Sequence, residues 1–86
     1  MDKNVLEFVV FIIHALSEAS HRSTTWIYKA LNDSGILDNY IIPCYDVLHT
    51  QGKEYLVEDI AGFMEEKGYH FYESQSPSDE LQGPRP

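Results

Sequence analysis

Asp46 and His49 are the residues of this chain whose types and spacing come closest to a catalytic pair. They stand three positions apart, so on a helix they share a face and the carboxylate could orient the imidazole as a general base. No serine or cysteine nucleophile motif accompanies this histidine. We favour the interpretation that His49 caps a helix and bonds Asp46 or a nearby backbone group. The sequence therefore predicts no catalytic residue, and a small hydrolase or transferase using this pair is the least favoured hypothesis.

Metal ligands and cofactor motifs are also missing from the sequence. The four histidines, His14, His21, His49 and His70, are scattered without the paired spacing of a zinc site. Cys44 is the single cysteine, so it has no partner for an internal disulfide or a metal knuckle. No glycine-rich phosphate loop is present. We expect no metal and no cofactor, and a cytoplasmic protein with Cys44 as a small core residue.

The charge of the chain indicates which partners suit it. Fourteen acidic residues against six basic ones give a net charge of −8, and the bases do not cluster. Nucleic acids and anionic membranes are bound through clustered Lys and Arg, so neither is an expected partner. An acidic surface suits a basic protein, although such charge also simply keeps a domain soluble.

The first apolar run predicts a helix from about Val5 to Ala19. Asn4 and Glu7 stand three apart, as in a capping box with Asn in place of Ser or Thr. The apolar run is too short to span a bilayer. Its β-branched residues also fit a strand, but the continuation H-A-L-S-E-A-S favours a helix.

A second helix of about nine residues follows, with Ser23, Thr24 and Thr25 as candidate N-caps. Gly35 is the natural left-handed residue after its end, and Trp26 is expected to anchor it. This segment and the corner helices are also compatible with a helix-turn-helix motif, so the alternative function is a helix-turn-helix-like transcriptional regulator. The absence of a basic patch counts against that alternative.

Two further helices are predicted, joined at a polar corner. The third runs from about Pro43 to Thr50 after a short turn or 3₁₀ segment at 40–42, and the fourth runs from Lys53 to Lys67 and ends at Gly68. Gly62 is expected to mark a close helix crossing. The corner and its flanks comprise Tyr45, Asp46, His49, Thr50, Gln51, Gly52, Tyr55 and Asp59. The prediction is an all-α, compact bundle of about four short helices over residues 1–72, followed by a disordered tail at 73–86.

The aromatic residues are more numerous than so small a core easily hides. Tyrosine and tryptophan are enriched at the energetic centres of protein interfaces. We therefore expect a non-enzymatic domain that contacts another protein, or a second copy of itself, through the first helix and the aromatic segment at 69–72. The expected contact residues are Phe8, Phe11, Trp26, Tyr69, Phe71 and Tyr72.

The corner string L-H-T-Q-G-K-E-Y-L-V-E-D-I at 48–60, with Leu6-Glu7-Phe8 opening the first helix, resembles a family of small bacterial proteins of unknown function. The resemblance covers about Asn4 to Gly68. Members of that family are often encoded beside a protein resembling ADP-ribosyltransferases. This implies an antitoxin or an accessory partner of such a protein. The family supplies no catalytic residues to transfer.

Overall fold

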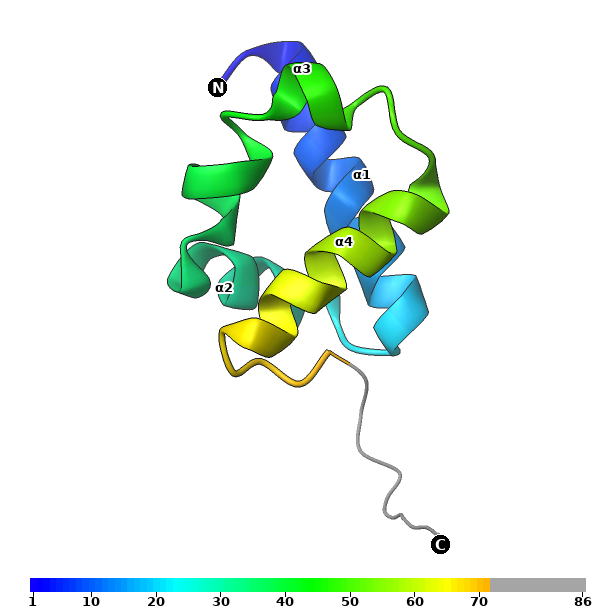
Figure 1. Cartoon of the computed structure of the whole chain (residues 1–86), viewed down its shortest axis with the longest axis vertical. Coiled ribbons are helices and arrows are strands. Elements are labelled where there is room, and N and C mark those ends of the chain that lie inside the picture. Colours follow the sequence, from blue (N-terminus) through cyan, green and yellow to red (C-terminus); the bar gives the residue numbers. More distant parts are fainter. Residues whose placement is uncertain (72–86) are drawn as a thin grey trace, which may run out of the picture.

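The computed structural model describes residues 1–71, all of whose regular elements are helices (Figure 1). In chain order these are α1 (Lys3–Ser20), α2 (Thr24–Ser34), the π-helix η1 (Leu37–Ile41), α3 (Tyr45–Leu48) and α4 (Lys53–Glu66). The predicted all-α fold is confirmed, and within residues 1–71 no strand occurs. The predicted tail at 73–86 lies outside the described residues.

α1 begins two residues earlier than the sequence suggested. The carboxylate of Asp2 accepts a hydrogen bond from the backbone N–H of Asn4 at 3.0 Å, so Asp2 is the N-cap. The expected cap at Asn4 is wrong, because Asp caps as well as Asn and stands two residues earlier, where the helix can begin sooner. The helix then continues to Ser20, which excludes a strand at this run.

α2 has the ends that its sequence predicts. The Ser23 hydroxyl accepts from the N–H of Trp26 at 3.0 Å, and Gly35 follows the helix with φ of 85°. A Cβ at Gly35 would also lie 2.9 Å from the amide nitrogen of Asn39. The positive φ favours glycine here, whereas the Asn39 amide is the end of a flexible side chain that can move. The helix has eleven residues rather than nine.

The segment between α2 and α4 differs most from prediction. Leu37–Ile41 forms a π-helix, with the Ile42 N–H donating to the Leu37 carbonyl at 3.0 Å, where a 3₁₀ turn was expected. α3 has only four residues and does not reach Thr50. The N–H of Thr50 donates to the carbonyl of Val47, three positions back. A 3₁₀-type turn therefore replaces the α-helix at this point.

The end of α4 confirms the role predicted for Gly68. This glycine has φ of 91°. Its N–H bonds the carbonyl of Glu65 at 3.0 Å, and the next N–H, of Tyr69, bonds the carbonyl of Met64 at 2.9 Å. These two bonds form a Schellman motif, which satisfies the carbonyls at the helix end and turns the chain back.

Gly62 does not lie at a helix crossing. It is exposed in the middle of α4, and a Cβ built on it meets nothing within 4 Å. The expected close packing at this glycine is therefore wrong. Since no contact requires the missing side chain, Gly62→Ala should raise the free energy of unfolding by about 1 kcal/mol through helix propensity. Chemical denaturation measures this, and a loss of stability would contradict it.

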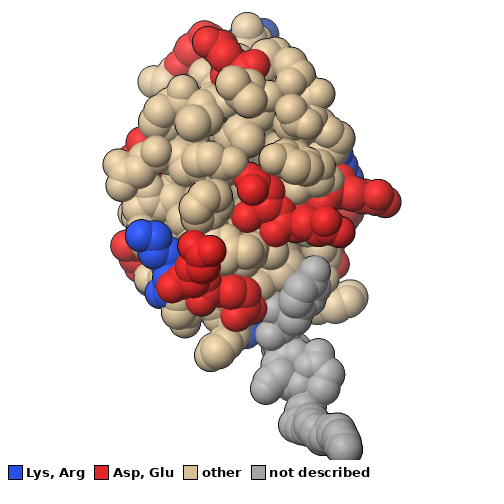
Figure 2. Space-filling model, in the orientation of Figure 1, with Lys and Arg blue, Asp and Glu red and all other residues tan. Residues whose placement is uncertain are grey.

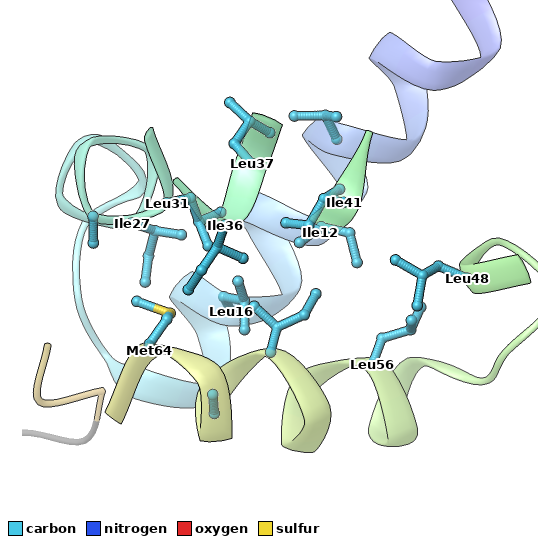
Figure 3. Close-up of a cluster of buried hydrophobic side chains, with 14 of the residues drawn as sticks. Ile12, Leu16, Ile27, Leu31, Ile36, Leu37, Ile41, Leu48, Leu56 and Met64 are labelled. Carbon is cyan, nitrogen blue, oxygen red and sulfur yellow. The ribbon is translucent and has the colours of Figure 1, made fainter. Parts of the chain in front are cut away.

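The hydrophobic core lies between α1, α2 and α4, because α1 packs against both other long helices. α3 closes the core at the end nearer the N-terminus, and η1 lies along its side between α2 and α3 (Figures 1 and 3). The side chains that form its centre come from all five elements: Ile12, Leu16, Ile27, Leu31, Leu37, Ile41, Leu48, Leu56, Ile60 and Met64.

Beyond Gly68 the chain folds back on the core, as residues 69–71 show. Phe71 is completely buried, and its N–H donates to the carboxylate of Glu65 at 2.9 Å. The Arg22 guanidinium donates from Nε to the carbonyls of His70 and Phe71, at 2.9 and 3.2 Å. Arg22 also lies 4.1 Å above the ring of Trp26. The Arg22 guanidinium, the Glu65 carboxylate and the Trp26 ring together hold residues 69–71 against α2 and α4.

Candidate interaction surface

The Asp46 and His49 side chains both stand on the exposed side of α3. His49 Nδ1 bonds the backbone carbonyl of Tyr45 at 2.8 Å, and its ring stacks on the Tyr45 ring with centroids 4.5 Å apart. Tyr45 in turn makes an edge contact with Phe8 of α1, at 5.4 Å between centroids. His49 therefore closes the end of α3 and fastens it to α1 through an aromatic stack. Asp46 takes part in no hydrogen bond or ion pair within residues 1–71.

The other corner residues separate into two groups. Thr50, Gln51 and Gly52 make the turn itself: the Thr50 hydroxyl donates to the Val47 carbonyl at 2.8 Å, and Gly52 is the N-cap position of α4. Tyr55 is exposed and points away from the core. Asp59 lies a full turn further along α4. The structure thus joins Tyr45 to His49 but leaves Tyr55 and Asp59 outside this cluster.

Asp59 instead accepts a hydrogen bond from the phenol of Tyr40. η1 holds Tyr40 against α4, where its ring packs on Phe63 with centroids 4.7 Å apart. Burial and the Asp59 carboxylate both raise the pKa of the Tyr40 phenol above its usual range. The pair therefore links η1 to α4, a connection that no sequence motif indicated.

Tyr40→Phe should lower the free energy of unfolding by about 1–3 kcal/mol, because it removes a hydrogen bond to a carboxylate. Tyr28→Phe, at an exposed tyrosine, is the matched control and should change little. Because the folded state holds the Tyr40 proton more tightly, this stabilisation is present below pH about 10 and is lost as the pH rises further. Denaturation at neutral and alkaline pH measures both effects, and equal losses in the two variants would contradict the assignment.

The expected contact residues are not all on the surface. Phe8 and Phe71 are buried in the core, which corrects their assignment as contact residues: their rings complete a small core rather than meeting a partner. Trp26 and Tyr69 are half-buried and pack edge to face, 6.4 Å between centroids. Phe11 alone among those described is largely exposed, and Tyr72 lies outside the described residues.

Several large apolar side chains of α1 and one of α2 are exposed. Leu6, Val10 and Phe11 of α1 are 49, 46 and 43% exposed, and Tyr28 of α2 is 47% exposed. We call these four residues the α1 face. Leu6 and Val10 were not among the expected contact residues because that expectation named aromatic side chains, and Tyr28 was not included although it is aromatic. Leu6 and Val10 stand four positions apart, so they share one side of α1.

A shallow groove of about 340 Å³ runs beside the α1 face, between α1 and α2. Its lining carries no Asp, Glu, Lys or Arg, which is unusual on a chain with a net charge of −8. The lining residues are Val10, Ile13, His14, Thr24, Thr25 and Tyr28. Large apolar patches on small soluble domains mark sites where another molecule binds.

The acidic residues gather elsewhere. Figure 2 shows their side chains in separate groups on the side of the molecule that carries α4. Glu54, Glu58, Glu65 and Glu66 are exposed there, and Lys53 is the only base within α4. The exposed side of α4 is therefore rich in carboxylates.

No helix in residues 1–71 has the length and apolar character needed to cross a membrane. In the same residues, no three His, Cys, Asp or Glu side chains are grouped to hold a metal ion.

Comparison with known proteins places the chain in a family. Neither the curated proteins nor the solved structures give a significant match. The model of a family described as a protein of unknown function, DUF3791, matches residues 7–67. This match spans α1 to α4 and includes both the corner and most of the α1 face. The chain therefore belongs to the DUF3791 family of proteins of unknown function.

Proposed function

We propose that this chain is a non-enzymatic domain that binds another protein through the α1 face and the neighbouring groove. The observation that carries the proposal is the exposure of Leu6, Val10, Phe11 and Tyr28, four large apolar side chains on two adjacent helices. Burial of such side chains is the main source of affinity in protein association. Phenylalanine and tyrosine on a helix surface are also typical anchors.

The corner supports a structural rather than a catalytic role for its histidine. The Nδ1 atom of His49 makes a hydrogen bond with the Tyr45 carbonyl, and one face of the His49 ring stacks on the Tyr45 ring. A general base needs an orienting partner and a concave site for its substrate. His49 and Asp46 are both exposed on a four-residue helix instead. These contacts explain His49 as part of the joint between α3 and α1, whereas Asp46 contributes no hydrogen bond or ion pair to that joint within residues 1–71.

The partner that we propose is the product of an adjacent gene, a protein resembling ADP-ribosyltransferases, as the resemblance at 48–60 implies. The chain would then act as an antitoxin or an accessory subunit. Its net charge of −8 suits a partner with a basic surface.

The test is co-expression of this chain with the adjacent gene product, followed by size-exclusion chromatography with light scattering. We expect one peak with the mass of a complex. Val10→Asp should separate the two proteins, because it places a charge in the apolar interface. Val47→Asp is the matched control, since Val47 is exposed on α3 outside the groove, and it should leave the complex intact.

Two separate peaks for the wild-type proteins at micromolar concentration would overturn the proposed partner. Equal effects of Val10→Asp and Val47→Asp would overturn the α1 face as the contact. Melting temperatures of both variants show whether either has lost its fold. A light-scattering mass of twice the chain for the protein alone, lost in Val10→Asp, would assign the face to a second copy instead.

A further inference from the structure

A second groove, of about 490 Å³, lies between the C-terminal half of α1 and the first turns of α4. Its apolar lining comes from Ala15, Ala19 and Val57, the first of which is buried and the others half-buried. Its remaining lining residues are charged: Glu18 from α1, and Lys53, Glu54 and Glu58 from α4. The groove therefore combines an apolar floor with a rim of three carboxylates.

The chain already places one cation in this groove. Lys53 Nζ lies 3.0 Å from Glu18 Oε1, with both side chains more than half exposed. Glu54 and Glu58 have no ion pair within residues 1–71. They stand four positions apart on α4, where like charges repel each other. Two of the three carboxylates thus lack a cation that would relieve this repulsion.

We propose that this groove receives a lysine- or arginine-bearing amphipathic segment of a partner protein. The inference deepens the proposed function and rests on it. The partner's aliphatic stems would cover Ala15, Ala19 and Val57, and its cationic heads would pair with Glu54 and Glu58. Long basic side chains suit such a site, because they bury apolar stems while their charge stays at the rim.

Other occupants fit the groove less well. The rim repels phosphates, so a nucleic acid or an anionic lipid is disfavoured. A metal ion needs three or more ligands converging on one point, and within residues 1–71 no such group exists. A second copy of this chain would bring a net charge of −8 to an acidic rim. A basic segment is the occupant that the charge favours.

The probe is a fluorescent helical peptide with leucine on one face and lysine on the other, titrated by fluorescence anisotropy. The wild-type chain should bind it, with affinity that falls as salt is added. Its twin, with glutamate in place of each lysine, should not bind. Glu58→Lys should weaken binding about tenfold or more, because it replaces an attraction by a repulsion. Glu66→Lys makes the same change of charge on α4 outside the groove and should weaken binding less than about threefold.

Two further readouts separate binding from folding. Glu58→Lys leaves Glu54 four residues before a lysine, a favourable pair, so its melting temperature should stay the same or rise while binding falls. Lys53→Gln removes the lysine that forms an ion pair with Glu18. The affinity of this variant for the lysine peptide should therefore rise by about twofold or more. A gain of affinity cannot arise from a loss of fold.

Three results would overturn the inference: no binding of the lysine peptide at low salt, equal binding of its glutamate twin, or equal losses in Glu58→Lys and Glu66→Lys. Failure here is distinguishable from failure of the proposed function. Suppose that Val10→Asp abolishes the complex with the adjacent gene product, whereas Glu58→Lys and added salt leave it unchanged. The α1 face is then supported as the contact surface, and the acidic groove is rejected as a binding site.

Discussion

Phe71→Ala is expected to lower the free energy of unfolding by about 3–5 kcal/mol, the usual cost of removing a buried phenylalanine. The side chain is 0% exposed although it lies after the last helix. Its loss would empty part of the core and free the segment that Arg22 and Glu65 hold. For a domain this small, the loss is most of the total stability.

Thermal and chemical denaturation of Phe71→Ala and His70→Ala test this expectation. His70 is the adjacent, exposed side chain, and its replacement should change the free energy of unfolding by less than about 0.5 kcal/mol. A stability of Phe71→Ala within about 1 kcal/mol of the wild type would mean that Phe71 does not belong to the core.

Leu48→Ala should cost about 2–5 kcal/mol, because Leu48 is the buried side chain that fixes α3 to the core. Its neighbour Val47 offers a matched control. Val47 is 64% exposed and Leu48 is 3% exposed, so two adjacent aliphatic residues differ chiefly in burial. Val47→Ala should change stability by less than about 0.5 kcal/mol.

Urea denaturation curves of the two variants give the comparison directly. Similar midpoints for Leu48→Ala and Val47→Ala would contradict the placement of α3. A normal midpoint for Leu48→Ala together with a loss in Val47→Ala would mean that α3 is rotated by about a quarter turn from its described position.

The long helices could be predicted because their signals are local. Ser23 and Gly35 cap α2 and Gly68 ends α4 through backbone bonds within a few residues, so short motifs suffice to locate them. Leu56, Ile60 and Met64 recur at the four-residue spacing of an amphipathic helix, and all three are buried. The start of α1 was misplaced because Asp2 and Asn4 are both good N-cap residues, and α2 is two residues longer than expected.

The features that the sequence did not reveal depend on contacts between distant segments. The π-helix carries Tyr40 to Asp59, nineteen positions away, and no local pattern specifies that bond. Burial of Phe71 depends on Arg22 and Glu65, which no spacing rule connects. Gly62 was misread for the same reason: a glycine within a helix marks a crossing only where another element passes, and here none does.

The α1 face is the central claim, and chemical-shift mapping tests it most directly. The ¹⁵N-labelled chain would be titrated with the unlabelled product of the adjacent gene. We expect the largest amide shifts at 6–14 and 24–28, which carry the α1 face and its groove. Shifts confined to η1 and to the opposite, exposed side of α4, or no shifts at saturating concentration, would contradict it.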